Sequence, residues 1–233
     1  YGMEATDGDI GKVEEFYFED KNWAIRYLVV KTGSWLFGRS VLISPMALQK
    51  ADWERREFPV NLTKEQVSNR PDIEMHKHVS RQHEIALYEH YAWQPYWGSG
   101  FCSGGLWGMI PPTPLFDEPI IKDDDVTTNV QSDNDDLHLR STDRVTGYHI
   151  HTTDDAIGHV TDLVIDDKTW HILYFVIDTH NWIGGKKVLI PVSVIKEVKW
   201  ENSIVLVDIT TDAVKSSKVF NESEFMNMEK NRL

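Results

Sequence analysis

The residues best suited to chemistry are histidines and carboxylates that gather in one segment of the chain. A predicted helix carries a His-Glu pair at residues 83–84 and a Glu-His pair at 89–90, and residues 76–78 hold two more histidines. Imidazole and carboxylate groups are good ligands for zinc or iron. However, His83 and His90 are separated by two helical turns, whereas ligand pairs on a helix usually use a spacing of three or four. The pattern therefore favours hydrated or hydrogen-bonded polar side chains, and we expect no metal site and no cofactor.

The other candidate motifs are incomplete. His149 and His151 alternate in a predicted strand and share one face, but two ligands do not complete a structural zinc site. The aspartate run at 133–136 lacks the spaced glycine and the terminal glutamate of a calcium loop. Ser80 and Ser141 lack the turn that surrounds a nucleophile, and no glycine motif for phosphate or dinucleotide binding occurs. With no catalytic machinery to name, we expect a protein that is not an enzyme.

Charge and cysteine content narrow the partners and the compartment. The chain has 24 Lys and Arg against 37 Asp and Glu, a formal charge of -13, and it has no basic patch. We therefore expect no nucleic-acid partner. Cys102 is the only cysteine, which excludes an intrachain disulfide and favours the cytoplasm. No run approaches the roughly 18–20 apolar residues that a membrane-spanning helix needs.

The chain contains an internal sequence match, and this match predicts the domains that position these residues. The sequence aligns with itself without a gap at an offset of 158 minus 11, or 147 residues. The matched positions include residues 10–13 with 157–160, residues 41–43 with 188–190, and Trp23, Trp35 and Trp53 with Trp170, Trp182 and Trp200. This number of aromatic and glycine coincidences predicts two copies of one domain.

Each copy has the pattern of short strands. Apolar blocks at 25–30 and 172–177 follow polar turns at 19–22 and 166–169, which predicts hairpins with a central buried strand. Thr63 and Gln66 have capping-box spacing and predict a short helix. We therefore expect a mainly β protein of two repeated small antiparallel β-barrels.

The segment between the copies does not repeat. Ser80 is the predicted N-cap of a helix over 81–93, in which Ile85, Tyr88 and Ala92 share one face. Glycine, proline and aspartate dominate the rest of this segment, which is typical of a linker. The predicted boundaries are 1–68 for the first barrel, 69–147 for the linker, 148–220 for the second barrel and 221–233 for a C-terminal tail.

Both copies resemble the PRC-barrel family. The resemblance lies in residues 7–13, 23–30 and 35–45 of the first copy, and in residues 157–158, Trp170, 174–179 and 182–191 of the second. The family includes the cytoplasmic domain of the photosynthetic reaction-centre H subunit and the C-terminal domain of a ribosome maturation factor, which both dock onto larger assemblies. The chain looks more like stand-alone tandem bacterial members, and fold alone does not assign a function.

The resemblance implies a non-enzymatic scaffold or protein-interaction module. We expect an unidentified protein partner, an intrachain pseudo-dimer that is compatible with a homo-oligomer, and association with a membrane-bound complex at the cytoplasmic side of the inner membrane. Aromatic side chains often anchor interfaces, so the candidate partner-binding residues are Trp35, Trp182, Trp93 and Trp97. Packing of Trp35 and Trp182 within their own barrels is the competing interpretation. The alternative function is a metal- or small-ligand-binding protein that uses the linker histidines.

Overall fold

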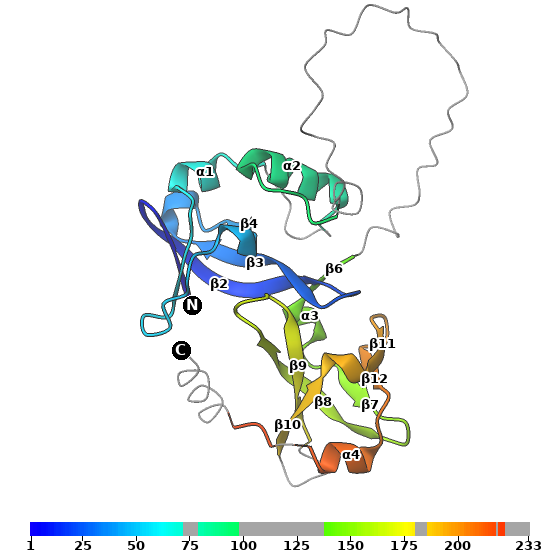
Figure 1. The fold of residues 1–233 in the computed structure, drawn as a ribbon. Helices are drawn as coiled ribbons and strands as arrows, with labels where there is room; N and C mark the ends of the chain where they lie inside the picture. Colours follow the sequence, from blue (N-terminus) through cyan, green and yellow to red (C-terminus); the bar gives the residue numbers. More distant parts are fainter. Residues whose placement is uncertain (72–78, 98–137, 180–185, 218, 222–233) are drawn as a thin grey trace, which may run out of the picture. The chain divides into compact units, whose positions relative to one another are not determined.

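The computed structural model describes residues 1–71, 79–97, 138–179, 186–217 and 219–221 (Figure 1). The chain forms two compact units. Unit 1 contains Tyr1–Ser68 and His138–Leu233, and unit 2 contains Asn69–Leu137. The predicted linker thus begins where unit 2 begins, but its last ten positions, from His138 on, belong to unit 1. Below, the first half of unit 1 means residues 1–68 and the second half means residues 138–221.

The first mixed sheet has six strands, five from the first half of unit 1 and β6 from the second half. Its order is β4-β3-β2-β1-β5, and β6 pairs with β2. The strands are β1 (Gly2–Ala5), β2 (Gly8–Glu19), β3 (Ala24–Thr32), β4 (Ser40–Ile43), β5 (Glu57–Pro59) and β6 (Leu139–Ser141). Strand β3 lies between β2 and β4, is buried along most of its length and reads as an almost continuous apolar run.

A second mixed sheet of six strands lies in the second half, with the order β10-β9-β8-β7-β12-β11. The strands are β7 (His149–His151), β8 (Ala156–Ile165), β9 (Ile172–Asp178), β10 (Lys187–Pro191), β11 (Ile195–Lys199) and β12 (Ile204–Val207). Strand β9 has the same central place here that β3 has in the first sheet.

The expectation of closed antiparallel barrels needs correction. Among the described residues neither sheet closes on itself, and each contains one parallel pair, β1 with β5 and β7 with β12. Residues 45–47 and 192–194, just after β4 and β10, form the short 3-10 helices η2 and η3, and the chain then returns to pair with the first strand of its sheet. Hydrophobic alternation predicts that a strand exists, but it carries no information on the direction of its neighbour.

Many structural details recur at a difference of 147 residues, and we call two such positions counterparts. Val13 pairs with Val30, and their counterparts Val160 and Ile177 pair with each other. Bulges follow Val13 and Val160. Helices α1 (Lys64–Ser68) and α4 (Thr211–Lys215) begin and end at counterpart positions. The predicted capping box is present at the first of these helices, since Thr63 and Gln66 exchange hydrogen bonds.

Unit 2 contains helix α2 (Arg81–Tyr91), which Ser80 caps as predicted. The predicted apolar face is right for Tyr88, which is buried, but wrong for the other two residues, because Ile85 is 41% exposed and Ala92 is the left-handed residue that ends the helix. The buried side chains of the helix are Glu84, Leu87, Tyr88 and Tyr91. The buried glutamate explains the error, since sequence patterns assign a carboxylate to the exposed face.

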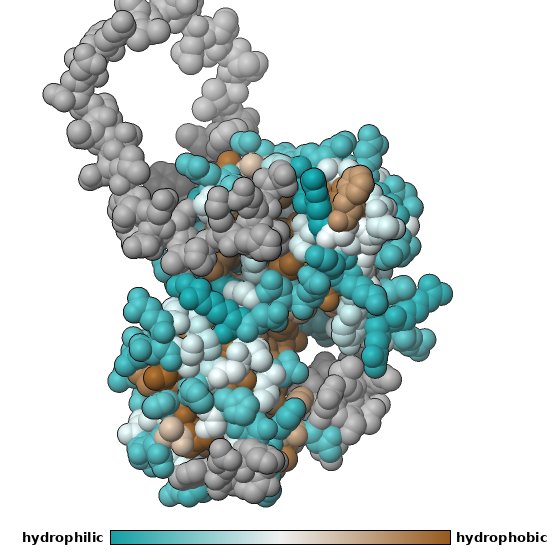
Figure 2. Space-filling view, turned by 180° about the vertical axis from the view of Figure 1, so that it is seen from behind, coloured by the Kyte–Doolittle hydropathy of each residue, from teal (hydrophilic) through white to brown (hydrophobic). Residues whose placement is uncertain are grey.

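Hydrophilic residues dominate the face of the molecule shown in Figure 2, where hydrophobic residues form small, separate patches. Among the described residues, no helix is long and apolar enough to cross a membrane.

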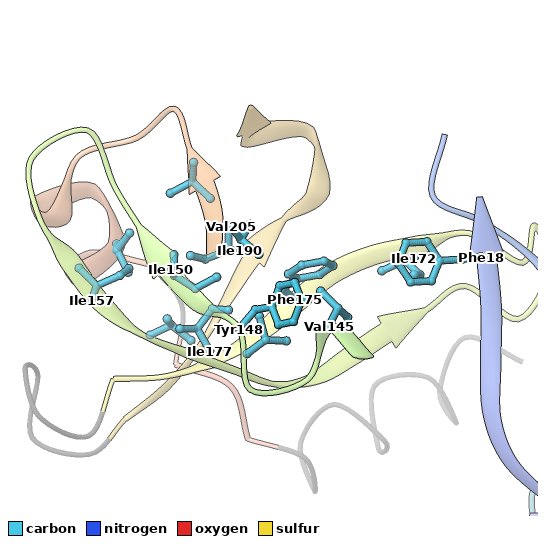
Figure 3. Packing of buried hydrophobic residues seen from close by; sticks show 14 of the residues in the cluster. Phe18, Val145, Tyr148, Ile150, Ile157, Ile172, Phe175, Ile177, Ile190 and Val205 are labelled. Carbon is cyan, nitrogen blue, oxygen red and sulfur yellow. The ribbon is translucent and has the colours of Figure 1, made fainter. Parts of the chain in front are cut away.

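The buried core of the second half includes two residues of the first half. Phe18 and Ile25, from β2 and β3, belong to a cluster that is otherwise built by β7 to β10, β12 and their connecting helices. Figure 3 shows Phe18 beside Ile172, at one end of this cluster. Phe18 is completely buried, so the second sheet depends on the first for part of its core.

A pair of counterpart glycines allows close contact between strands. Gly11 and Gly158 have φ angles of 153° and 142°, and a Cβ atom at either position would lie 2.0 Å from a carbonyl oxygen, that of Lys31 or of Asp178. Only glycine combines this backbone conformation with so little space.

We predict that Gly158→Ala lowers the free energy of unfolding by about 2–4 kcal/mol, because backbone strain adds to a clash with a strand carbonyl. Urea denaturation measures the change. Gly147→Ala is the matched control: Gly147 also has a positive φ, 90°, but open space around its Cβ position. Equal losses in the two variants would show that strain alone matters and that the close contact does not.

Candidate functional site

Two counterpart hairpin loops of unit 1 each hold a tryptophan in the left-handed backbone conformation. Trp23, between β2 and β3, and Trp170, between β8 and β9, have φ angles of 61° and 54°. The Trp23 N–H donates to Glu19 O and the Trp170 N–H donates to Asp166 O, both at 2.9 Å. Bulky residues rarely adopt the left-handed conformation, and its cost is tolerated only where the surrounding structure stabilises it.

Side-chain oxygens stabilise both loops. Asn22 Oδ1 accepts from the Ala24 N–H at 3.0 Å in the first loop. Asp166 Oδ1 accepts from the N–H groups of Lys168 and Thr169, both at 2.8 Å, in the second. Hydrogen bonds to the charged carboxylate, first of all that from Thr169, lower the pKa of Asp166 below its ordinary value of 3.8.

The two loops pair with each other through their backbones. The Ile25 N–H donates to Trp170 O at 2.7 Å, and the Ile172 N–H donates to Trp23 O at 2.9 Å. These two bonds are counterparts, since 25 plus 147 is 172 and 23 plus 147 is 170. Ala24 faces His171, its own counterpart, in an antiparallel bridge. The contact therefore has the form of an isologous interface, in which each side presents the same groups to the other.

The tryptophan rings pack across the same contact. Trp23 lies edge-on to Phe175 of the second half, with ring centroids 5.4 Å apart, and stacks on Phe18 at 5.6 Å. Trp170 packs against Phe16 and Phe58 of the first half, at 6.5 and 6.0 Å. Each hairpin thus contributes an aromatic ring to the other half, which fixes the two halves against each other.

Strand β6 adds a third connection between the halves. It extends the edge of β2, with Phe18 opposite Arg140. The Phe16 N–H donates to Thr142 Oγ1 at 3.0 Å, just beyond the strand. Arg140 contacts Asp20 at 3.1 Å, and its guanidinium lies 4.5 Å from the ring centre of Trp200. A segment that precedes the second sheet in the chain therefore completes the first.

Of the predicted partner-binding residues, Trp35 is the one that the structure places in unit 1. Its Nε1 donates to Ile10 O at 2.7 Å, and the Lys64 ammonium lies 5.1 Å from its ring centre. The ring is half-buried and contributes to fixing its loop. Its neighbour Phe37 is 87% exposed and has a φ of 56°. Trp182, the counterpart of Trp35, lies outside the described residues.

Trp93 and Trp97 lie in an aromatic cluster of unit 2. Trp93 stacks on Tyr91 at 4.4 Å, and Trp97 lies edge-on to Tyr88 at 4.8 Å. The Arg81 guanidinium lies 4.4 Å from the ring centre of Trp97. These rings contact one another, and their role in partner binding stays a prediction.

A buried carboxylate lies beside the same arginine. Glu84 accepts a 2.7 Å hydrogen bond from the Tyr96 hydroxyl and forms a 2.8 Å ion pair with Arg81. Burial, followed by the charge of Glu84, raises the pKa of the Tyr96 hydroxyl. Both of these partners lie in unit 2, so the charge of Glu84 is balanced within its own unit.

The metal-site candidates remain without support among the described residues, where no three His, Cys, Asp or Glu side chains gather around one point. His149 and His151 do lie on one face of β7, opposite the buried Ile150. His76, His78, Cys102 and the aspartate run at 133–136 lie outside the described residues. A cavity of about 280 Å³ opens between the first hairpin loop and β11, lined by Asp20, Lys21, Trp23, Ile195, Lys196, Glu197, Val198 and Trp200.

Comparison with known families agrees with the mainly β fold. Residues 142–214, from α3 (Thr142–Val145) to α4, contain a PRC-barrel domain. A search of curated proteins found no match.

The sequence did not identify the two loop tryptophans as contact residues, although it aligned them. The available signal was an aromatic residue directly after a polar turn, at the same position in both copies. A tryptophan there is too large and apolar to be explained by the turn itself.

We predict that Trp170→Asn lowers the free energy of unfolding by about 2–4 kcal/mol, because it removes the ring that contacts Phe16 and Phe58. Asparagine tolerates the left-handed conformation, so the backbone strain does not increase. Thermal and urea unfolding measure the change, and Lys168→Ala, in the same loop, is the control with little effect. A wild-type midpoint in Trp170→Asn would contradict the cross-packing.

A second prediction concerns pH. The folded-state pKa of Asp166 is lowered, so its contribution to stability is present above the ordinary value of 3.8 and disappears as the pH falls through the folded-state value. The difference in stability between wild type and Asp166→Ala should therefore be largest near neutral pH and should shrink below about pH 4. Asp167→Ala removes a carboxylate that has no hydrogen-bond partner among the described residues, and it serves as the control with a free energy of unfolding close to that of wild type. Denaturation curves from pH 3 to 7 provide the measurement, and a difference that grows towards acid would contradict the assignment.

Proposed function

We propose that this chain is a non-enzymatic scaffold or protein-interaction module. In this proposal residues 1–68 form a second PRC-type domain beside the one found at 142–214, and the two act as an intrachain pseudo-dimer. The common registers, bulges and helix bounds of counterpart positions support the duplication. The reciprocal hairpin contact supports the pseudo-dimer.

The proposal of a protein partner rests on the exposure and the backbone conformation of Phe37. Its ring is 87% exposed, the largest exposed fraction among the exposed large hydrophobic residues of the described part of the chain. Its left-handed backbone costs roughly 1–2 kcal/mol for a residue other than glycine. A residue that is both strained and exposed contributes little to its own fold, which is typical of binding sites.

The loop around Phe37 is held in place. The Trp35 indole is tied to the Ile10 carbonyl, and the Gly38 N–H donates to Gly33 O at 3.1 Å and closes the loop. A fixed loop loses little conformational entropy when a partner binds, so an exposed ring on it can bind with more of its interaction energy retained. In this arrangement Trp35 acts by positioning Phe37, and the interpretation of Trp35 as packing within its own domain agrees with that role.

The class of partner follows from surface chemistry and resemblance. A net charge of -13 favours partners with basic surfaces. The resemblance to the cytoplasmic domain of the reaction-centre H subunit suggests that the partner is a membrane-bound complex. The chain itself would then lie in the bacterial cytoplasm, at the periphery of the inner membrane.

The test is site-specific cross-linking. A photo-reactive amino acid at position 37 should cross-link a defined protein in the native host. In affinity capture without the cross-linker, Phe37→Asn should reduce the recovery of that protein at least about tenfold, since a central aromatic anchor contributes 2 kcal/mol or more. Asparagine suits the left-handed position, so Phe37→Asn should unfold at or above the wild-type temperature. If Phe37 had only a structural role, Phe37→Asn would not combine higher stability with a loss of binding.

Val219→Ser is the matched control, since Val219 is 48% exposed and lies at the edge of the second sheet. It should leave the recovered protein unchanged. If the same protein is recovered equally with Phe37→Asn, the loop is not the binding site. If no defined protein is cross-linked at position 37, the proposed function itself is wrong.

A further inference from the structure

The edge of β2 shows how this fold accepts an additional strand. β6 pairs with residues 17–19, the Asp20 N–H donates to His138 O at 3.4 Å, and a hydroxyl satisfies the Phe16 N–H. The bound strand places Arg140 between an aspartate and a tryptophan, with its side chain 12% exposed. Strand pairing and a charge-assisted contact thus act together.

The counterpart edge comprises the last residues of β8 and the first two residues of the turn that follows it, residues 163–167. Strand β8 pairs with β7 and β9, and no other strand of the described residues lies along this edge. The Leu163 N–H donates to its neighbour's carboxylate, Asp162 Oδ1, at 2.8 Å. Its counterpart Phe16 uses Thr142 instead. The backbone N–H of Leu163 is therefore bonded to the side chain of its own neighbour, whereas the backbone N–H of Phe16 is bonded to a hydroxyl of the segment that contains β6.

The two residues that contact Arg140 also have counterparts in the other half of unit 1. Asp20 and Trp200, which hold Arg140, correspond to Asp167 and Trp53. Trp53 packs on Phe58 at 6.0 Å, and Phe58 packs on Trp170 at 6.0 Å, so this tryptophan lies close to the end of the second hairpin. Asp167 is exposed and its carboxylate has no partner among the described residues.

We propose that this edge of β8 binds an extended, arginine-bearing strand of a partner protein, antiparallel to β8 and in the manner of β6 on β2. This inference rests on the proposed function and names a second contact and its chemistry. Asp162, Asp166 and Asp167 belong to this segment. The carboxylates of Asp162 and Asp166 accept local backbone N–H groups, which leaves Asp167 to contact a partner. Together with the overall negative charge, the three aspartates favour a basic strand over an acidic or purely apolar one. The arginine of that strand forms an ion pair with Asp167 and stacks on Trp53.

The probe is a synthetic peptide with blocked ends and the sequence of residues 137–142, which contains the strand that β2 already accepts. Titrated into the full chain, it should shift backbone amide signals of residues 163–167 in NMR spectra. Asp167→Lys should weaken binding at least about fivefold, the loss expected for a charged contact at a partly exposed site. A peptide with glutamate in place of its arginine should bind Asp167→Lys more tightly than wild type. Asp208→Lys, at an exposed carboxylate in the loop after β12, is the control without effect.

Three outcomes would overturn the inference. The first is the absence of shifts at 163–167 with a folded protein. The second is a set of shifts at 17–19, which would mean that the peptide replaces β6 and leaves the β8 edge free. The third is a concentration-dependent dimer that Asp167→Lys abolishes, which would assign the edge to a second copy of the chain. Each of these leaves the cross-linking result at Phe37 unaffected, so the two proposals fail separately.

Discussion

Unit 1 depends on two backbone hydrogen bonds between loops, Ile25 N to Trp170 O and Ile172 N to Trp23 O. The two bonds join counterpart residues, so the same loop conformation supplies one donor and one acceptor on each side of the contact. The bonds require the carbonyl groups of two tryptophans to point outward at the end of a hairpin, and the left-handed conformation of these residues is compatible with that direction. Strain in two residues is thereby offset by a contact that unites two sheets.

The consequence for packing is that the halves share their cores. Phe18 and Ile25 of the first half are buried in the cluster of the second, and the ring of Trp170 packs against the first. A shared core couples the stability of both sheets, because a cavity opened on one side removes contacts from the other. The contacts between the halves also hold the surface loops of one half in place relative to those of the other, unlike the loops of two domains on a flexible connection.

The sequence predicted the mainly β class, most strands and several helix caps, because alternation, turn residues and capping spacing are local signals. It failed where long-range geometry decides. The directions of β5 and β12 depend on where the chain returns, and the burial of Glu84 depends on Arg81 and Tyr96. The candidate site was partly visible: Trp35 was identified for its loop position, whereas exposed Phe37 had no counterpart aromatic to draw attention to it.

The reciprocal hairpins also bear on how the chain folds during synthesis. Ala24 and its partner His171 are 147 positions apart, and at a typical 5–20 residues per second the ribosome needs roughly 7–30 s between them. The edge of β2 lacks the cover of β6 until residues 139–141 have been made, and the first hairpin lacks its backbone partners until residues 170–172 have been made. Nascent chains on neighbouring ribosomes could pair there instead, since each carries the same complementary loop. The first half of unit 1 is therefore completed only after most of the chain has been made.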